Sequence, residues 1–349
     1  ATTEAGRRAL DARARPYEYD APAVFFDPVD RARDLFAQII GADAAGVAVV
    51  PSVSYAMAVA ARNLPFAAGQ RVLVLDEQFP SNVYVWRELC ERRGGEVITV
   101  PRPPDGDWTT AVLQRLGSEV AVAALPHAHW TDGGRVDLES IGERCEQVGA
   151  ALVVDGSQSI GAVPLDVGRV RPAVVVTGMY KWLLGPYTLG FAWFAPPFRE
   201  GQPLEFNWAA REGSRDFTRL TDYTPHLAPG ARRYDVGQVS NFALMPQAVA
   251  ALEQILGWGV PRIVARLAGI TEALCEISAE AGLGVEPAPH RSPHMIGARI
   301  ERGDPARIAE ALRAGRVHVS LRSGSIRISP HVHVTDADVA RFERALASA

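Results

Sequence analysis

The fold is decided by one stretch of sequence, Val174-Val-Val-Thr-Gly-Met-Tyr-Lys-Trp-Leu-Leu-Gly-Pro-Tyr-Thr-Leu-Gly-Phe-Ala-Trp-Phe-Ala195. Two β-rich runs, 173–177 and 188–195, flank a turn that glycine and proline punctuate. Lys181 in this turn therefore follows the carboxyl end of a buried strand. Open α/β sheets place their ligands at that edge.

Lys181 is the only lysine in the chain, beside 35 arginines. This bias indicates that arginine stands wherever only a positive charge is needed. Arginine stays protonated, whereas a lysine amine can lose its proton, attack a carbonyl and form a Schiff base. The sequence therefore predicts a catalytic role for Lys181, with the chance survival of one surface lysine as the alternative.

A second apolar run, 151–154, ends in Asp155 and continues as Gly156-Ser-Gln-Ser-Ile-Gly161. A carboxylate at the end of a core strand is costly unless a cation or hydrogen-bond donors meet it. The protonated ring nitrogen of pyridoxal phosphate is such a partner, because a carboxylate beside it keeps the ring able to withdraw electrons from a substrate carbon. A loop-capping aspartate is the alternative.

Two further segments place polar groups after strand-like runs. His127 follows the run 119–125, so its imidazole is a candidate to lie over a flat aromatic cofactor, with a packing or surface role as the alternative. Ser52 and Ser54 lie at the start of an Ala-rich helix, where free backbone N–H groups and the helix dipole favour a phosphate. A serine N-cap without a ligand is the alternative there.

Four segments in fixed order resemble the class V aminotransferase family, and within it the isopenicillin-N-epimerase-like and aminotransferase-like members. They are Pro51-Ser-Val-Ser-Tyr55, Pro126-His-Ala-His-Trp-Thr-Asp-Gly133, Val153-Val-Asp-Gly-Ser-Gln-Ser-Ile-Gly161 and Gly178-Met-Tyr-Lys-Trp-Leu-Leu-Gly-Pro186. The resemblance runs from about residue 25 to the end of the sequence. It implies an α/β fold with a large domain that binds pyridoxal 5'-phosphate on a mostly parallel, seven-stranded sheet between helices, and a smaller C-terminal α+β domain.

The resemblance also implies a role for each matching residue. Lys181 forms the internal aldimine with the cofactor, Asp155 pairs with the pyridinium nitrogen and His127 stacks on the ring. The other implied cofactor contacts are Gln158 near the phenolic oxygen, Val53, Ser54 and Tyr180 at the phosphate, and Gln238 reaching the phosphate from the partner subunit of a homodimer. Family members commonly have threonine at the position of Gln238.

For the substrate, the resemblance implies that Arg327 pairs with an α-carboxylate in a fork geometry. Arg322 either binds a second acidic group or faces solvent. Two features of the family have no match in the sequence: a Tyr-Leu-Asn-like segment that approaches the substrate, and the reactive cysteine that desulfurases carry shortly before the substrate-binding arginine. There is no cysteine between 315 and 331.

The periodic segments alternate strand and helix, which is typical of a largely parallel sheet. Helices are predicted at 28–40, opened by Asp27 and Pro28 and stopped by Gly41, and at 81–93, opened by Ser81. The predicted strands are 71–75, 96–100, 119–125, 151–154, 173–177 and 188–195.

After Pro246 the pattern changes. Helices at 246–257 and near 261–281 precede a strand, helix, strand, strand, helix order. We expect a large domain over 16–255 and a small one over 256–349, with 1–15 packed near the latter. The irregular stretch 196–243, rich in aromatic residues and arginine, is expected to be an interface or active-site segment.

Composition excludes several classes of protein. Of 349 residues, 48% are hydrophobic and 22% charged, with a net charge of −4, so no basic field exists to attract nucleic acid or a membrane surface. No apolar run approaches the roughly 20 residues of a membrane span, and the first residues lack the apolar core of a signal peptide. We expect a cytoplasmic protein with a small-molecule partner. Cys90, Cys145 and Cys275 lack CxxC spacing, so buried thiols are expected, without a disulfide or a metal site.

In the reaction that the resemblance implies, the amine of an amino acid displaces Lys181, which then takes the α-proton as general base. Transamination ranks first, C–S lysis or another β-elimination second, and epimerisation third. A non-enzymatic binding protein is disfavoured because Lys181, Asp155 and His127 occur together. A nucleotide-binding dehydrogenase is disfavoured because no GxGxxG follows an early strand.

Overall fold

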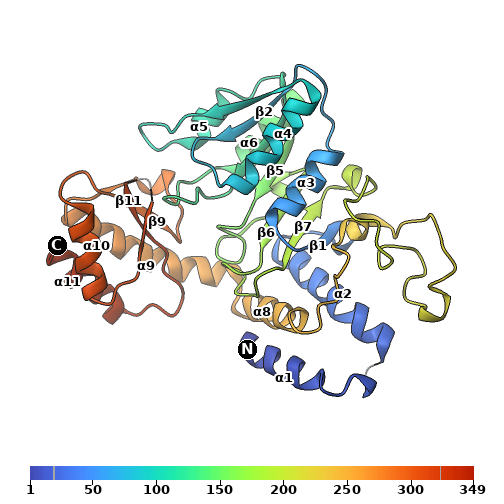
Figure 1. Cartoon of the computed structure of the whole chain (residues 1–349). Helices are drawn as coiled ribbons and strands as arrows, with labels where there is room; N and C mark the ends of the chain where they lie inside the picture. Colours follow the sequence, from blue (N-terminus) through green and yellow to red (C-terminus); the bar gives the residue numbers. More distant parts are fainter. Residues whose placement is uncertain (19, 323) are drawn as a thin grey trace.

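A seven-stranded sheet and a four-stranded sheet organise the computed structural model, which describes residues 1–18, 20–322 and 324–349 (Figure 1). Five neighbouring strands of the larger sheet run parallel, and β7 is antiparallel to both of its neighbours. In spatial order the strands are β1 (Val47–Val50), β7 (Gly190–Phe194), β6 (Val174–Gly178), β5 (Ala151–Asp155), β4 (Val120–Pro126), β2 (Arg71–Leu75) and β3 (Glu96–Val100). The predicted mostly parallel, seven-stranded sheet is confirmed.

Helices cover both faces of this sheet, and its central strands are therefore near-continuous runs of Val, Leu and Ala rather than alternating ones. Val72 and Val74 of β2 face one apolar cluster, whereas Leu73 and Leu75 face the other. The first cluster includes α3 (Val53–Asn63) and α4 (Tyr84–Arg93). The second includes α2 (Ala21–Ile39), α5 (Trp108–Leu113), α6 (Leu138–Val148), the short α7 (Val167–Val170) and α8 (Met245–Trp258).

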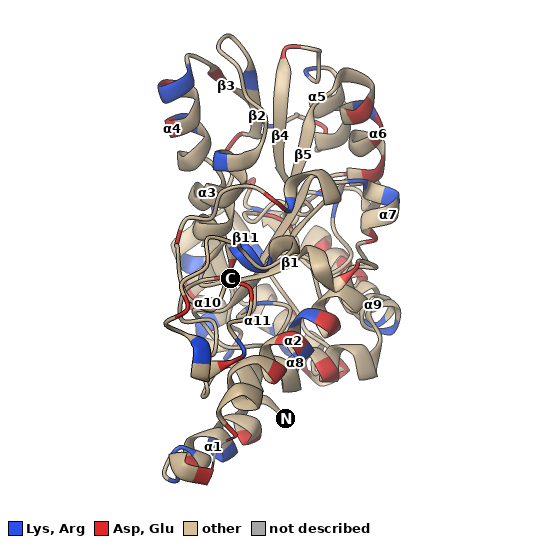
Figure 2. Ribbon diagram, turned by 90° about the vertical axis from the view of Figure 1, so that its right-hand side faces the viewer, with Lys and Arg blue, Asp and Glu red and all other residues tan. Residues whose placement is uncertain are grey.

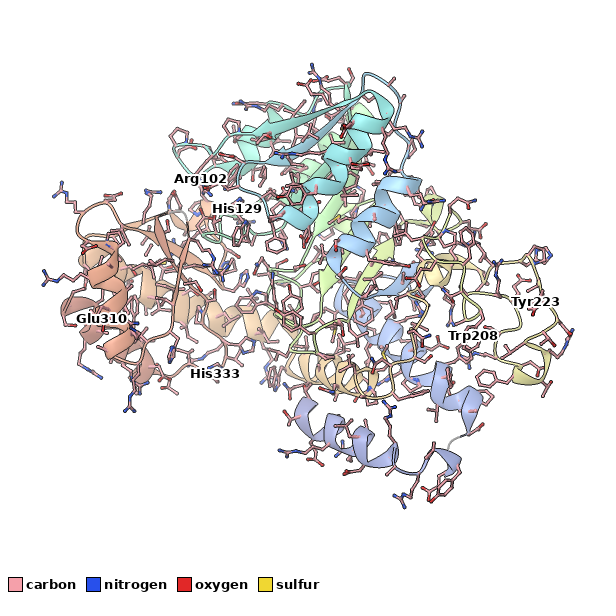
Figure 3. All side chains as sticks on the ribbon, viewed as in Figure 1. Arg102, His129, Trp208, Tyr223, Glu310 and His333 are labelled. Carbon is pink, nitrogen blue, oxygen red and sulfur yellow. The ribbon has the colours of Figure 1, made fainter. Side chains whose placement is uncertain are left out.

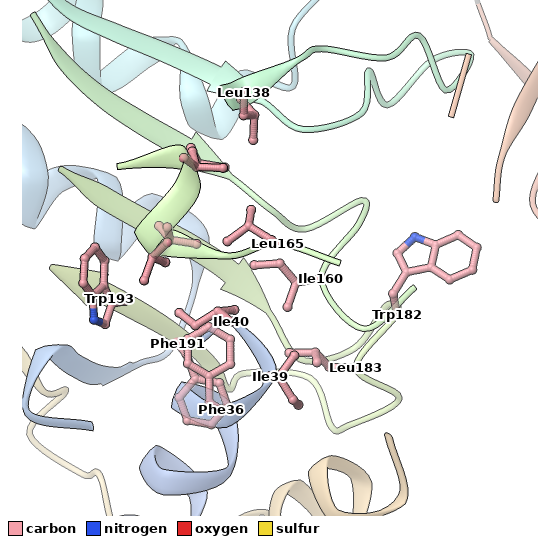
Figure 4. Close-up of a cluster of buried hydrophobic side chains, with 14 of the residues drawn as sticks. Phe36, Ile39, Ile40, Leu138, Ile160, Leu165, Trp182, Leu183, Phe191 and Trp193 are labelled. Atoms are coloured by element: carbon pink, nitrogen blue, oxygen red, sulfur yellow. The ribbon is translucent and has the colours of Figure 1, made fainter. Parts of the chain in front are cut away.

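The second cluster is drawn in Figure 4, where α2 lies against the β7 side of the sheet. Phe36 of α2 stacks on Phe191 of β7 with ring centres 4.7 Å apart. Both side chains are almost completely buried. This packing fixes α2 under the sheet edge that carries β1 and β7.

Two predicted helix starts are wrong. The helix expected from residue 28 begins at Ala21, with Pro28 inside it. An interior proline costs about 3 kcal/mol, and the buried face that includes Phe26 and Val29 outweighs this cost. The helix expected from Ser81 begins at Tyr84, because Pro80–Asn82 forms a separate 3-10 turn. The predicted strands agree with the observed ones within two residues at each end.

The smaller sheet is antiparallel, in the order β10 (Ser320–Arg322), β11 (Ser325–Ile328), β9 (Ile296–Arg299) and β8 (Gly284–Val285). Its helices are α9 (Val260–Glu280), α10 (Pro305–Ala314) and α11 (Asp336–Ala347). The predicted order lacks β8, which has two residues and is too short for a periodic pattern. Helix α9 contributes side chains to the cores of both units, so they share one helix. The division at residue 256 stays a prediction.

The remaining parts of the fold are the N-terminal helix and the long connection between β7 and α8. Helix α1 (Thr2–Ala12) packs against α8. The stretch between β7 and α8 holds only the 3-10 turns Pro196–Phe198, Phe217–Arg219 and Gly230–Tyr234 among its described residues. It carries the exposed aromatic residues Trp208 and Tyr223, which Figure 3 places far from the small unit.

The structure also shows the state of the cysteines, the distribution of charged residues and the length of the apolar helices. Cys90, Cys145 and Cys275 are buried free thiols, as predicted. Figure 2 shows basic and acidic positions mixed over the helices of both units. Among the described residues no single helix is long and apolar enough to cross a membrane, and α8 with α9 reach that length only as a pair bent by 75°.

Candidate active site

The carboxyl ends of β4, β5 and β6 meet at one edge of the large sheet. Asp155 ends β5, opposite Pro126 at the end of β4, and Lys181 follows β6 by three residues. The chain leaving these parallel strands encloses a cavity of about 320 Å³. Six residues predicted to bind the cofactor line it: Val53, Ser54, Asp155, Gln158, Tyr180 and Lys181.

Lys181 is half-buried between aromatic rings. Its Nζ lies 5.3 Å from the ring centre of Phe79 and 5.6 Å from that of Tyr180. Burial lowers the pKa of this amine; Asp155 opposes the change and Arg327 adds to it. A lowered pKa increases the share of neutral amine, which is the form that attacks a carbonyl.

Asp155 is only 7% exposed. One carboxylate oxygen, Oδ1, accepts a hydrogen bond from the backbone N–H of Ser157 at 3.0 Å. Within the described part of the chain it forms no ion pair with an arginine or with Lys181. The capping contact of the alternative interpretation therefore exists, but it leaves a buried carboxylate facing the cavity without a cation. The protonated ring nitrogen of pyridoxal phosphate is a cation that would fit beside this carboxylate.

The amino end of α3 supplies donors to the same cavity. Ser52 is the N-cap of this helix, and its Oγ accepts from the backbone N–H of Tyr55 at 3.2 Å. Val53 and Ser54 form the first turn, whose N–H groups have no acceptor within the helix. The serine cap is thus present, and it is compatible with a phosphate at the helix start. Tyr180, across the cavity, stacks on Tyr187 with ring centres 3.9 Å apart.

His127 does not line the cavity of the other predicted cofactor residues, and its stacking on a cofactor ring stays a prediction. Its side chain lines a different cavity, between α6 and the small unit, and its Nδ1 lies 3.0 Å from Oγ of Ser159. The reason is the alternation of side chains along the chain that leaves β4: Pro126, Ala128 and Trp130 line the Lys181 cavity, and His127 points to the opposite side. Trp130 is the aromatic side chain of this segment at the cavity, and the sequence argument missed it.

His294 of the small unit is a second residue that the sequence argument missed. Its Nε2 donates to the backbone carbonyl of Gln158, so its Nδ1 accepts from the hydroxyl of Ser292 at 2.6 Å. The imidazole is fully buried, which lowers its pKa to about 4. The small unit therefore holds the loop after Asp155 through a neutral histidine. No sequence signal could identify this contact, because the two residues are 136 positions apart.

A wider cavity of about 580 Å³ adjoins the first one and shares Lys181, Trp130 and Gln158 with it. Arg327 and Arg322 of the small unit both line it. Arg327 Nη1 donates to the carbonyl of Trp130 at 2.7 Å, while its buried Nε has no hydrogen-bond partner among residues 1–18, 20–322 and 324–349. The exposed Arg322 thus borders the cavity instead of only facing bulk solvent.

Gln238 lines neither of these cavities in its own chain. The segment that carries it is tied to β1, because Asp235 Oδ1 accepts from the backbone N–H of Val49 at 2.8 Å and Asp235 also pairs with the buried Arg33. Its contact with the phosphate of a partner subunit stays a prediction.

A half-buried lysine and an unpaired carboxylate at the carboxyl edge of a mostly parallel sheet define a site of the kind that binds pyridoxal phosphate. The chain belongs to the class V aminotransferase family: the family profile "Aminotransferase class-V" matches residues 17–342. This is a family of pyridoxal-phosphate-dependent enzymes, as the four-segment resemblance implied.

Three known proteins illustrate the likeness. An uncharacterized aminotransferase, YcbU of Bacillus subtilis (strain 168), is 29% identical over 88% of this chain and 80% of its own. Isopenicillin N epimerase of Streptomyces clavuligerus is 24% identical over 95% of this chain and 87% of its own. The solved structure of the cystine C-S lyase C-DES superposes with a TM-score of 0.87 at 18% identity, covering 99% of this chain and 93% of that one. The last likeness concerns the fold alone.

Proposed function

We propose that this protein binds pyridoxal 5'-phosphate through Lys181, acts at the α-carbon of an amino acid and catalyses transamination. The observation that carries this proposal is that the single lysine of the chain lines the same cavity as the unpaired, buried Asp155. When bound, the cofactor supplies an electron sink for the bond that breaks at the α-carbon. Similarity to a protein described as an aminotransferase over most of both chains supports transamination in particular.

Residues of this chain would hold the cofactor at three points. Asp155 would hold the ring nitrogen protonated, and Gln158 would contact the phenolic oxygen. The start of α3, through Val53 and Ser54, and the hydroxyl of Tyr180 would bind the phosphate. Trp130, which borders the cavity, would contact the ring in place of His127.

Lys181 then acts as the general base. The buried environment lowers the pKa of Lys181 and so increases the share of neutral amine that can accept the α-proton. Arg327 binds the α-carboxylate and so fixes which bond faces the lysine. The destination of the proton separates transamination from elimination and from epimerisation, and all three reactions use this arrangement.

A panel of L-amino acids, offered with and without a 2-oxo acid, tests the reaction. We expect amino-group exchange that depends on the 2-oxo acid. Release of ammonia and a 2-oxo acid without it would identify a lyase, and loss of optical activity alone would identify an epimerase.

Borohydride reduction before digestion should label only the peptide that contains Lys181; a labelled site elsewhere, or none, contradicts the cofactor assignment.

We also propose a homodimer in which Gln238 reaches the phosphate in the partner subunit, and a cytoplasmic location in keeping with the composition. The exposed aromatic residues of the long connection support an interface there. Gln238→Ala should weaken cofactor retention about tenfold, the loss of one charge-assisted hydrogen bond, without lowering the unfolding temperature of the apoprotein. Sedimentation across dilution provides the check on assembly, and a fully active monomer would exclude the shared site.

A further inference from the structure

We infer that the substrate carries a second anionic group beside its α-carboxylate, and that Arg322 binds this group. The inference rests on the proposed function, in which Arg327 binds the α-carboxylate. The second group is a carboxylate or another anionic oxyacid group at the end of the amino-acid side chain. The argument combines strand register, charge and the contacts of one tryptophan.

Strand register places the two arginines on one face of the β10–β11 hairpin. Ser320 of β10 lies opposite Arg327 of β11. Arg322 is two residues further along β10, so its side chain leaves the same face as those of Ser320 and Arg327. Such diagonal neighbours start about 7–8 Å apart. Two long side chains that start at this spacing can bind the two anionic groups at the ends of one small amino acid.

The charge of the wider cavity is unbalanced. Lys181, Arg322 and Arg327 line it together with the imidazoles of His331 and His333, and no Asp or Glu is among its described lining residues. Neither arginine forms an ion pair in the described chain. By contrast, Arg299 and Arg313, on the same small unit, pair with glutamates. A cluster of cations without carboxylates is a site for an anionic ligand.

The contacts of the two arginines lead to the same conclusion. Among the described residues, Arg322 donates only to the carbonyl of its neighbour Leu321, at 2.8 Å. Within the same residues, the buried Nε of Arg327 and Nε2 of His331 have no hydrogen-bond partner. Burial lowers the pKa of Arg327, and Arg322 adds to the effect, so the two cations repel each other. Most of their donors are therefore free for a ligand.

Trp130 links both guanidinium groups to the cofactor cavity. Its carbonyl accepts from Arg327, and its ring centre lies 5.8 Å from Cζ of Arg322. The same side chain lines the cavity of Lys181. A ligand held between the two arginines thus lies next to the lysine amine, where the chemistry of the proposed function takes place.

The test compares acidic amino acids with their neutral amides on the cofactor-loaded protein. The probes are L-glutamate with L-glutamine and L-aspartate with L-asparagine, with L-2-aminoadipate and L-homocysteate to set the length and kind of the acid. Dissociation constants come from the change in the absorption spectrum of the bound cofactor. We expect at least one acid to bind about tenfold more tightly than its amide, the value of one charge-assisted hydrogen bond.

Variants assign the preference to its residue. Arg322→Gln should bring the ratio of the two dissociation constants close to one, whereas Arg327→Gln should weaken both members of a pair alike. Arg307→Gln is the matched control, because Arg307 is exposed on α10 and lines neither cavity, so its ratio should equal that of the unaltered protein.

Calorimetric titration with glutarate and its monoamide extends the test to ligands without an amine. Their binding needs no reaction at Lys181, so it reports on the arginines even if the cofactor assignment fails. A glutarate preference that Arg322→Gln abolishes supports the inference in that case as well. Equal binding of acid and amide in every pair, no binding by any probe, or a preference that survives Arg322→Gln overturns it.

Discussion

The two walls of the active site differ in construction. The wall from the large sheet holds one carboxylate and one amine, Asp155 and Lys181, at the ends of strands that are buried on both faces. The wall from the small unit presents Arg322 and Arg327 on a short hairpin, with Arg322 exposed. The first wall suits chemistry that demands fixed positions, and the second suits selection of a ligand by charge. If the two walls have these separate roles, substitutions in the first should change the chemistry and substitutions in the second the choice of ligand.

Lys181→Arg should have the largest effect, because it keeps a positive charge and removes the only side-chain amine able to form a Schiff base. We expect loss of covalent attachment and a fall in turnover of at least about a thousandfold. Absorption spectra and mass spectrometry after borohydride reduction measure attachment. The matched control adds Arg307→Lys to this variant, which restores a lysine on the surface. Recovery of activity in that double variant, or full activity in Lys181→Arg, would show that the large wall does not carry the chemistry.

Asp155→Asn separates a role at the ring nitrogen from a role as a loop cap. Asparagine can still accept the hydrogen bond from Ser157, but it cannot hold a ring proton by charge. We expect the cofactor to stay bound and turnover to fall about a hundredfold or more. Steady-state kinetics with a cofactor-content assay measure both. Nearly normal turnover would exclude the role at the ring nitrogen and leave the capping contact as the role of Asp155.

Trp130→Ala and His127→Ala test which aromatic side chain borders the cofactor. Trp130 lines the cavity and His127 does not, so Trp130→Ala should weaken cofactor binding about tenfold and change its absorption spectrum, in line with the usual value of an aromatic contact. His127→Ala should leave the spectrum unaltered and lower stability instead. A change in the spectrum with His127→Ala, and none with Trp130→Ala, would instead support stacking of His127 on the ring.

The sequence could predict the large wall because its residues follow strands directly. Asp155 and Lys181 are placed by the ends of β5 and β6, and parallel strands bring their carboxyl ends together. For His127 the predicted place and the observed cavity differ, and its stacking role stays a prediction. The face on which its side chain lies depends on the course of the chain after Pro126, because a shift of one residue reverses the face of the sheet. Pro28 predicted the start of α2 at the wrong residue, because the burial of Phe26 and Val29 outweighs the cost of a proline inside the helix.

The small wall could be predicted only in part. Arg327 was found through a family resemblance, whereas the shared face of Arg322 and Arg327 depends on the register of a hairpin. The contact between His294 and Gln158 joins segments of two units and leaves no periodic pattern. Long-range contacts of this kind depend on how the units dock, which sequence spacing does not record.

His294 joins the two walls, and its burial predicts the smallest effect, a loss of stability at mildly acidic pH. Burial lowers its pKa from the ordinary 6.5 to about 4, and that of His127 likewise. Between these values the unfolded chain binds protons that the folded chain does not, so the free energy of unfolding decreases as the pH falls from about 6.5 toward 4 and is independent of these groups above 6.5. Each histidine should contribute about 1 kcal/mol between about pH 7.5 and pH 5.5.

Urea denaturation at these two pH values measures the difference. His294→Gln and His127→Gln should each remove part of the pH dependence, and the double variant should remove more than either single variant. His318→Gln is the control, because the side chain of His318 is exposed. The pH dependence of this variant should match that of the unaltered protein. If His294→Gln leaves the slope unchanged, folding does not lower the pKa of this imidazole, and the assignment of His294 as a buried neutral link between the walls is wrong. If it removes the slope and also raises the dissociation constant of the cofactor, the small unit positions the loop of Asp155 as well as selecting the ligand.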